Sequence, residues 1–205
     1  MKKVKQWLCL LLAVFAVSGA VAGMSVLREQ QAIAQKLVRL HVRANSDTEE
    51  DQEVKLQVRD AVLQQVQTVT ADCTDSQEAI CVLADHLPAL AQTASETLRN
   101  LGKPNAVRVS LCEETFPTRN YDTFSLPAGN YAALRVDIGA AEGHNWWCVV
   151  FPTLCMSATT DGMEEAAQAA GFSEEELELL TEDTPKVQIK FRILEFFSDL
   201  FHGAP

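Results

Sequence analysis

Apolar and polar residues alternate in four stretches of the chain, which is the pattern of a β-strand with one buried face. A fifth predicted strand, residues 145–152, is apolar on both sides, as in a strand covered on both faces or one with an exposed apolar face. The short segment 139–143 predicts a hairpin into this strand. Helical spacing also fits residues 186–201, so strand and helix both stay open for the last of the four stretches. The four alternating stretches are residues 36–43, 106–112, 131–138 and 187–193.

Between these strands, apolar residues recur at the spacing of amphipathic helices. The first helix is predicted to begin at Ser46, which has capping-box spacing to Glu49, and to end near Thr70. The second is predicted to begin near Asp75, and Pro88 within it predicts a kink or a break.

Three shorter helices are predicted after residue 152. One lies around residues 163–170, one begins at Ser173 with a capping box to Glu176, and one covers residues 194–201. This order of elements predicts a single α+β domain over residues 36–205. Its sheet is expected to be largely antiparallel, with about four to five strands and with helices packed on its apolar face.

The amino terminus has the layout of a secretory signal. Three lysines at positions 2, 3 and 5 precede an uncharged stretch, residues 7–27, and Ala20-Val21-Ala22 offers a cleavage site. The same stretch is long enough to span a bilayer if it is not cut. Residues 1–27 are therefore predicted to be a signal peptide or a membrane anchor, and we expect the folded part to lie outside the cytoplasm.

The composition is that of a globular protein, with 47% apolar and 22% charged residues. The formal net charge is -11, and removing the three leader lysines from that sum leaves -14 for the rest of the chain. A body this acidic repels a phosphate backbone, so nucleic-acid binding is excluded as the expected function. The expected partners are proteins.

The cysteines and histidines form no recognisable metal, redox or catalytic motif. Cys148 and Cys155 are spaced for a disulfide if the chain reverses between them, and buried free thiols are the alternative. Cys112 and His41 could meet across the sheet as a nucleophile pair. With no other catalytic constellation in the sequence, we expect no enzyme activity, no metal and no cofactor.

The polar sides of the predicted strands form one basic surface. Three explanations stay open for it: cover by the acidic segment 174–183, an acidic segment of a partner, or a solvated face with weak ion pairs. Its expected members are Arg39, His41, Arg43, Arg108, Arg135, Lys190 and Arg192, with Asp137 as the acid.

Trp146 and Trp147 are adjacent and must point to opposite sides of their strand. Tryptophan is enriched at interface hot spots, so one of the two is a candidate contact. Burial of both in the core is the alternative that we favour.

Two long motifs follow one another along the chain. The first has LHVRANSD at residues 40–47, DQ at 51–52, Lys55 and VRDAV at 58–62. The second has PAGNYAALRV at 127–136, GHNWWCVVFP at 143–152 and LC at 154–155. Through these motifs, over about residues 37–155, the chain resembles the stage II sporulation protein R family of endospore-forming bacteria.

The resemblance implies a signalling protein. Members of that family are made in the forespore and exported into the space between its membrane and that of the mother cell. There they activate a membrane-embedded aspartic-type protease, which processes the pro-form of a mother-cell sigma factor. The implied partner is therefore the extracytoplasmic surface of that protease, with membrane attachment through residues 7–27 as a further possibility.

The two motifs supply the candidate partner contacts. Each candidate has a structural alternative, since the motif residues could cap a helix, pair within the chain or lie in the core. An extracytoplasmic thiol-dependent hydrolase of cell wall or peptide, using Cys112 or Cys148, is the alternative function. The candidate contacts are Arg43, Asn45, Asp47, Lys55, Arg59, Asp60, Asn145, Trp146 and Trp147.

Overall fold

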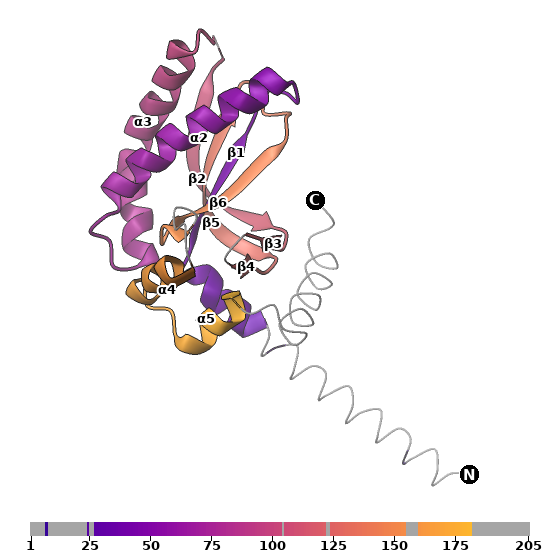
Figure 1. Cartoon of the computed structure of the whole chain (residues 1–205), viewed down its shortest axis with the longest axis vertical. Helices are drawn as coiled ribbons and strands as arrows, with labels where there is room; N and C mark the ends of the chain where they lie inside the picture. Colours follow the sequence, from indigo (N-terminus) through magenta and orange to yellow (C-terminus); the bar gives the residue numbers. More distant parts are fainter. Residues whose placement is uncertain are drawn as a thin grey trace.

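Figure 1 shows a computed structural model of the chain, in which residues 7, 24, 27–103, 105–121, 124–154 and 160–181 are described. Within these ranges, residues 27–35 are helical and precede the first strand. The labelled elements follow in the order β1 (Val38–Arg43), α2 (Glu49–Val69), α3 (Ser76–Asn100), β2 (Val107–Phe116), β3 (Arg119–Asn120), β4 (Ser125–Leu126), β5 (Gly129–Ile138), β6 (Asn145–Phe151), α4 (Thr160–Ala169) and α5 (Glu174–Thr181).

Strands β2, β5, β1 and β6 form one sheet in that order. β1 runs parallel to β5 and antiparallel to β6, and β2 is antiparallel to β5. The predicted α+β class is confirmed, with the correction that the sheet is mixed. Because β1 lies between β5 and β6, the predicted hairpin pairing of those two strands is wrong. Their connection instead crosses the end of β1.

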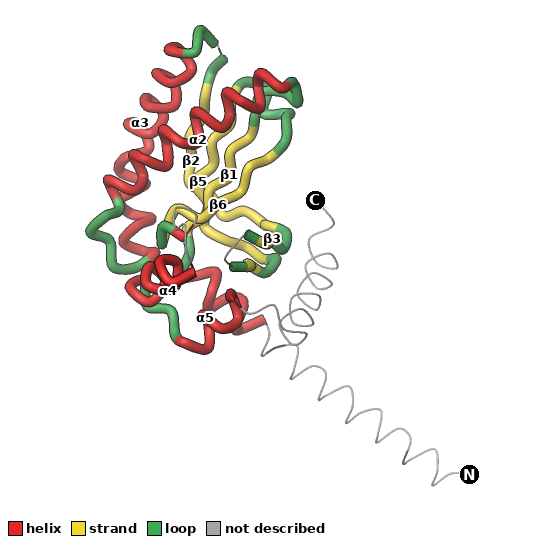
Figure 2. The backbone as a smooth tube through the Cα atoms, in the orientation of Figure 1, coloured by secondary structure: helices red, strands yellow, loops and turns green. Residues whose placement is uncertain are grey.

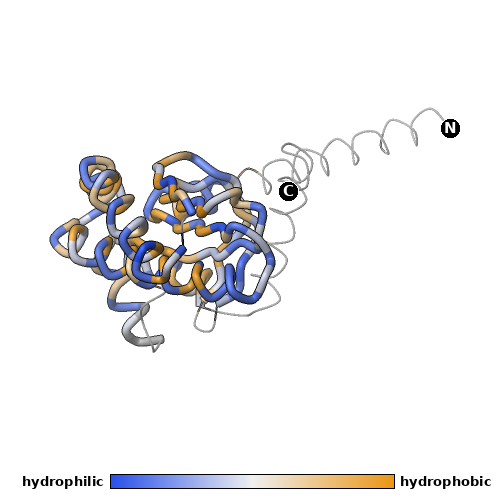
Figure 3. Tube along the Cα trace, turned by 90° about the horizontal axis from the view of Figure 1, so that it is seen from above, coloured by the Kyte–Doolittle hydropathy of each residue, from blue (hydrophilic) through white to orange (hydrophobic). Residues whose placement is uncertain are grey.

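Helices α2 and α3 cover one face of this sheet (Figure 2). Leu40 and Val42 of β1 lie beside Leu134 and Val136 of β5, and all four are fully buried. Figure 3 shows hydrophobic and hydrophilic residues interspersed along the backbone. The helices add aliphatic side chains to this core, among them Val54, Val58, Val62, Leu83, Leu90 and Leu98.

The capping residues of the helices agree only in part with those predicted from the sequence. The hydroxyl of Thr48, not Ser46, caps α2, because Ser46 is engaged by Asp51 in a side-chain hydrogen bond. Asp75 caps α3 as predicted, since its carboxylate accepts from the backbone N–H of Glu78. α3 continues through Pro88, so the predicted break is absent from this described helix.

The second face of the sheet is covered by the β3–β4 hairpin, which the sequence analysis did not predict. Tyr121 and Phe124 of this hairpin stack with ring centres 4.6 Å apart, and Phe124 is buried. β1 was predicted to be half-buried, but Arg39 and His41 on this side are buried as well. The expectation is wrong because the hairpin and the aromatic residues of β2, β5 and β6 close over them.

The last described helices, α4 and α5, lie at the end of the sheet where residues 27–35 enter (Figure 1). The predicted capping box of α5 is confirmed, since Ser173 and Glu176 exchange backbone-to-side-chain hydrogen bonds of 2.8 and 3.2 Å. Glu176 also pairs with Lys36 at 2.6 Å. The predicted elements at 187–193 and 194–201 lie outside the described residues.

Most of the predicted leader also lies outside the described residues, which include only Trp7, Met24 and Leu27 of residues 1–27. Of the helices that are described, none has both the length and the hydropathy that a bilayer span requires. The alternatives of signal peptide and membrane anchor stay predictions.

Candidate functional site

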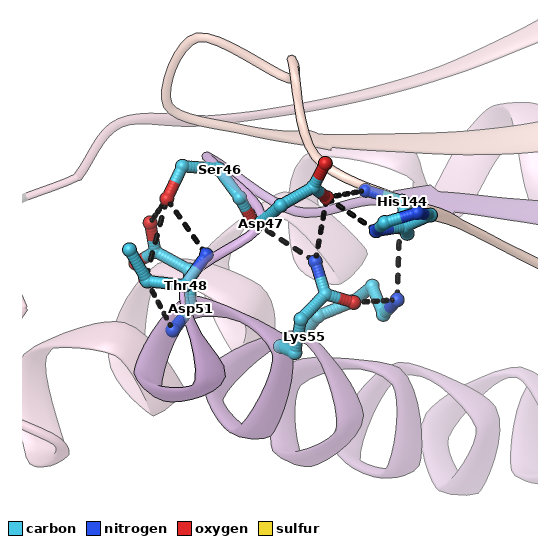
Figure 4. A network of polar contacts seen from close by, with 7 residues as sticks. Ser46, Asp47, Thr48, Asp51, Lys55 and His144 are labelled. Carbon is cyan, nitrogen blue, oxygen red and sulfur yellow. Dashed lines mark hydrogen bonds and ion pairs between the residues drawn. The ribbon is translucent and has the colours of Figure 1, made fainter.

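The two sequence motifs meet at one end of the sheet. The connection from β5 to β6 crosses the end of β1 and lies against the loop that leads into α2. The backbone N–H of Gly143 donates to Ala44 O at 3.0 Å, and that of Glu142 donates to Asn45 O at 3.3 Å. Residues about 95 positions apart in sequence thus form one structural unit (Figure 4). We call residues 45–48, 51, 52 and 55 together with 139–144 the loop brace.

Two glycines allow this close approach. A Cβ atom on Gly143 would lie 2.2 Å from the backbone oxygen of Ser46. A Cβ atom on Gly139 would lie 2.1 Å from Asn45 Oδ1, and Gly139 also has a positive φ of 59°. Both contacts are far shorter than van der Waals contact, so side chains at these positions would push the two loops apart.

Asp51 is the acceptor at the centre of the first half of the brace. Its Oδ2 accepts from Asn45 Nδ2 at 2.8 Å and from Ser46 Oγ at 2.5 Å. These hydrogen bonds hold the pKa of Asp51 below its ordinary value. Asn45 also accepts from the N–H of Ala140 at 3.1 Å, so it ties the start of α2 to the crossing loop.

Asp47 and Lys55 form the second half of the brace. Asp47 Oδ1 accepts from the backbone N–H of His144 at 2.6 Å and lies 2.5 Å from His144 Nδ1. Lys55 is only 4% exposed, and its Nζ donates to His144 O at 3.0 Å and to Gln52 Oε1 at 2.5 Å. Burial, and then the charge of Arg59, lowers the pKa of Lys55. Figure 4 shows these contacts between α2 and the crossing loop.

A group of exposed and half-buried side chains borders the brace and shares Asp47 and His144 with it. Trp146 points to the helix-covered side and is 39% exposed, and the guanidinium of Arg59 lies 4.2 Å from its ring centre. Arg59 Nε also donates to Asp60 at 2.7 Å. The expectation that both tryptophans are core residues is therefore wrong. We call Asp47, Arg59, Asp60, His144 and Trp146 the Trp146 patch.

The remaining three candidates lie on the opposite face of the sheet. Arg43 Nε donates to Asp137 at 2.7 Å. Asn145 Oδ1 lies 2.8 Å from His41 Nε2, and the ring of Trp147 is centred 5.6 Å from that of His41. The structure thus brings six of the nine candidates together around the brace and separates these three from them.

The predicted basic face exists, although one of its acids was missed. The register places Arg39, His41, Arg43, Arg108 and Arg135 on the same side as Asp137. Burial raises the pKa of Asp137, but the hydrogen bonds and charges of Arg43 and Arg135 outweigh it and give a net decrease. Lys190 and Arg192 lie outside the described residues.

Glu114 is the acid that the sequence analysis missed. Its Oε1 lies 2.8 Å from His41 Nδ1. Burial raises the pKa of Glu114, but the hydrogen bond and the charge of His41 lower it. The lowering effects outweigh burial, so the net shift is downward. The signal was present in the sequence, because Glu114 continues the alternation of the strand beyond residue 112, where the predicted strand ended.

The structure tests the suggested nucleophile pair of Cys112 and His41. Both nitrogens of His41 are occupied by Glu114 and Asn145, so the suggested Cys112–His41 pair is not formed. Burial, and then the charge of Glu114, raises the pKa of Cys112, which is opposite to the shift of an activated nucleophile. Within the described residues, no group of three His, Cys, Asp or Glu side chains is placed to hold a metal. The predicted disulfide involves Cys155, which lies outside the described residues.

Comparisons with known proteins assign the family. The family model described as stage II sporulation protein R matches residues 34–161. Stage II sporulation protein R of Bacillus subtilis (strain 168) is 32% identical over 210 aligned residues, which cover 90% of this chain and 93% of that protein. No solved structure matches the chain. The predicted resemblance is confirmed, and the chain belongs to the stage II sporulation protein R family.

Proposed function

We propose that this protein is an exported sporulation signal that activates a membrane-embedded aspartic-type protease. That protease processes the pro-form of the mother-cell sigma factor. Membership of a sporulation family supports a role in sporulation. The protease, the export and the location between the forespore and mother-cell membranes are parts of the proposal, as is attachment through residues 7–27.

The observation on which the proposal rests is the convergence of the two motifs on one end of the sheet. The loop brace holds Asn45, Asp51 and Lys55 in internal hydrogen bonds, so these residues act as a scaffold. What they present to solvent is the Trp146 patch, where an arginine stacks on an exposed tryptophan. Tryptophan and arginine are the residues most enriched at interface hot spots.

Activation by contact requires a difference in affinity. A bound activator shifts a protease toward its competent state only if it binds that state more tightly than the inactive state. We place this contact at the Trp146 patch. The protein then needs no bond-breaking chemistry of its own, in keeping with the raised pKa of Cys112.

The test is a charge reversal with a matched control. Arg59→Glu and Trp146→Ala are introduced into the full-length gene in a spore-forming host, and cleavage of the sigma-factor pro-form is followed by immunoblot. We expect each to reduce processing at least tenfold, about 1.4 kcal/mol or more of lost contact energy. Arg99→Glu changes the net charge identically at an exposed position on α3 and is expected to leave processing unchanged.

Exported protein levels and circular dichroism separate a lost contact from a lost fold. Wild-type processing by both patch variants, at wild-type levels of folded protein, would contradict the contact site. Cys112→Ser and Cys148→Ser test the hydrolase alternative, and we expect both to retain full output. Loss of output by either one, with the fold intact, would favour an enzyme.

A further inference from the structure

The hairpin-covered face of the sheet contains a buried cation. Arg39 is fully buried, and its guanidinium carbon lies 4.0 Å from the ring centre of Phe116 and 4.9 Å from that of Tyr131. Its Nη2 donates to the hydroxyl of Tyr121 at 2.8 Å. The aromatic rings therefore cover Arg39 while one of its N–H groups is bound by the β3–β4 hairpin.

A second guanidinium is linked to the first through Tyr121 and Trp147. Arg119 of β3 stacks on Trp147, with its guanidinium carbon 3.7 Å from the ring centre. The hydroxyl of Tyr121 donates to Trp147 O at 3.3 Å, so the hairpin is fastened to β6 here. Burial lowers the pKa of Arg119, and the charge of Arg39 acts in the same direction. We call Arg39, Phe116, Arg119, Tyr121, Tyr131 and Trp147 the Arg39 cluster.

Three N–H-bearing nitrogens of this cluster have no acceptor. They are Nε and Nη1 of Arg39 and Nε of Arg119, all of them buried. Across the described ranges, the ion pairs include neither of these two arginines. The aromatic rings stabilise a guanidinium through its faces, but they do not satisfy the N–H groups that lie in its plane.

The other end of the same sheet face shows how the chain neutralises arginines when it supplies the acid itself. Arg43 and Arg135 share the carboxylate of Asp137, at 2.7 and 3.0 Å. The Arg39 cluster also has two cations, but both lie against aromatic rings, and no described acid forms an ion pair with either of them. The group that fits is a second carboxylate, because its oxygens accept charge-assisted hydrogen bonds from guanidinium N–H groups.

We propose that the Arg39 cluster is a binding site for a carboxylate, supplied by an acidic side chain of a protein partner. Arg119 and Trp147 are partly exposed, whereas Arg39 is fully buried. In this proposal the acid contacts Arg119 from solvent and reaches Arg39 when the covering rings move aside. The body of the chain is strongly acidic and repels polyanions, which favours a single acidic side chain over a nucleic acid. The proposal goes beyond the proposed function, since it does not depend on which protein the partner is.

This binding site adjoins the surface already described. Trp146 and Trp147 leave β6 on opposite faces, and each is covered by an arginine, Arg59 on one side and Arg119 on the other. In the described part of the chain, β6 is the last strand on its side of the sheet. A partner that contacts both faces of the sheet at this strand would bind the Trp146 patch on one face. It would place its acidic side chain at the Arg39 cluster on the other face.

The test follows the Nε–H resonances of the arginines by NMR, using ¹⁵N-labelled protein purified after export of the full chain. The probes are acetyl-glutamate N-methylamide, its neutral glutamine counterpart and inorganic phosphate. We expect saturable shifts of the Arg39 and Arg119 resonances with the glutamate probe, and at least tenfold weaker binding of the glutamine probe. Arg119→Lys keeps the charge but loses the planar N–H groups of the guanidinium, and we expect it to weaken binding at least tenfold.

Arg108→Gln is the matched control, because Arg108 is exposed on the same sheet face. It is expected to leave the binding of the glutamate probe unchanged. Shifts that do not saturate, or tighter binding of phosphate than of the glutamate probe, would overturn the proposal.

The chain itself is the other source of a carboxylate. Glu182, Asp183, Glu195 and Asp199 are therefore replaced together by their amides. If this change alone moves the two arginine resonances in the unbound protein, an acid of the same chain occupies the site and a partner does not. Sigma-factor processing is measured separately, so failure of the carboxylate site is distinguishable from failure of the proposed function.

Discussion

The loop brace and the Arg39 cluster are both polar assemblies in a mostly apolar protein, but they differ in how their polar groups are satisfied. In the brace, the buried amine of Lys55 has two acceptors, and Asp51 has two side-chain donors. In the Arg39 cluster, Arg39 donates a side-chain hydrogen bond to Tyr121, but three buried N–H-bearing nitrogens of Arg39 and Arg119 have no acceptor.

This difference separates residues that build the fold from residues that have capacity left for a ligand. None of the buried unpaired atoms found among the described residues belongs to the brace. Asn45 and Lys55, which the motif made candidate contacts, are therefore positioning residues, and their neighbours in the Trp146 patch are the candidate contacts. Arg39 and Arg119 were not candidates, yet among the described residues they are the arginines with buried N–H groups that have no acceptor.

Gly143→Ala should have the largest effect on the brace. The added Cβ would lie 2.2 Å from Ser46 O, so one of the two loops must move. We expect the free energy of unfolding to fall by about 3 kcal/mol, measured by urea titration. Gly102→Ala is the control, because Gly102 has a positive φ of 70° but open space around it. The backbone strain alone should cost about 1 kcal/mol, and equal losses for both variants would contradict the close-contact explanation.

Removing the two buried cations compares the assemblies directly. Lys55→Met leaves His144 O and Gln52 without their donor and should reduce the free energy of unfolding by about 2 kcal/mol. Arg39→Met loses ring contacts and the hydrogen bond to Tyr121, but it also removes an unpaired buried charge. We therefore expect its net effect to lie within about 1 kcal/mol of zero. A larger loss for Arg39→Met than for Lys55→Met would show that Arg39 is fully compensated within the chain.

Most strands could be predicted from the sequence, but their order in the sheet could not. Alternation identified β1, β2 and β5, an apolar run identified β6, and the cap of α3 followed from Asp75. Periodicity reports which residues share a face, not which strand lies next to which, so it did not place β1 between β5 and β6. The brace was hidden for the same reason, because it forms only when the crossing loop reaches the end of β1.

The β3–β4 hairpin was not predicted for a different reason. β3 and β4 are two residues each, too short for any alternation to be visible. Without that hairpin, Arg39 and His41 look like solvent-facing residues of a half-buried strand. The resemblance to a family identified Asn45, Asp47 and Trp146 as candidates. It did not show which of them stabilise the fold and which are exposed for contact, because that depends on burial and hydrogen bonding.

Low pH should reduce the stability of the protein through protonation of Glu114, on the hairpin-covered face. Its pKa is lowered from the ordinary 4.5 in the folded protein, so its stabilising effect is complete above that value and is lost as the pH falls through the folded pKa. Glu114→Gln should lower stability at pH 7 by about 1 kcal/mol and flatten the loss of stability below pH 4.5. Thermal unfolding between pH 3 and 7 measures both, and Glu113→Gln, an exposed neighbour, should change neither.

Asp60→Asn should have the smallest effect on stability, although it lies in the Trp146 patch. Asp60 is largely exposed and pairs with Arg59 at the surface, where such pairs contribute only about 0–0.5 kcal/mol. Arg59 stays stacked on Trp146 without it, because the stack depends on the ring and not on the carboxylate. Unfolding in urea should therefore be unchanged within error, whereas Arg59→Lys should leave stability intact and still reduce sigma-factor processing, since an ammonium cannot stack as a planar guanidinium does. If Asp60→Asn destabilises the protein as much as Lys55→Met, the patch belongs to the scaffold, and the distinction between brace and exposed contact surface does not hold.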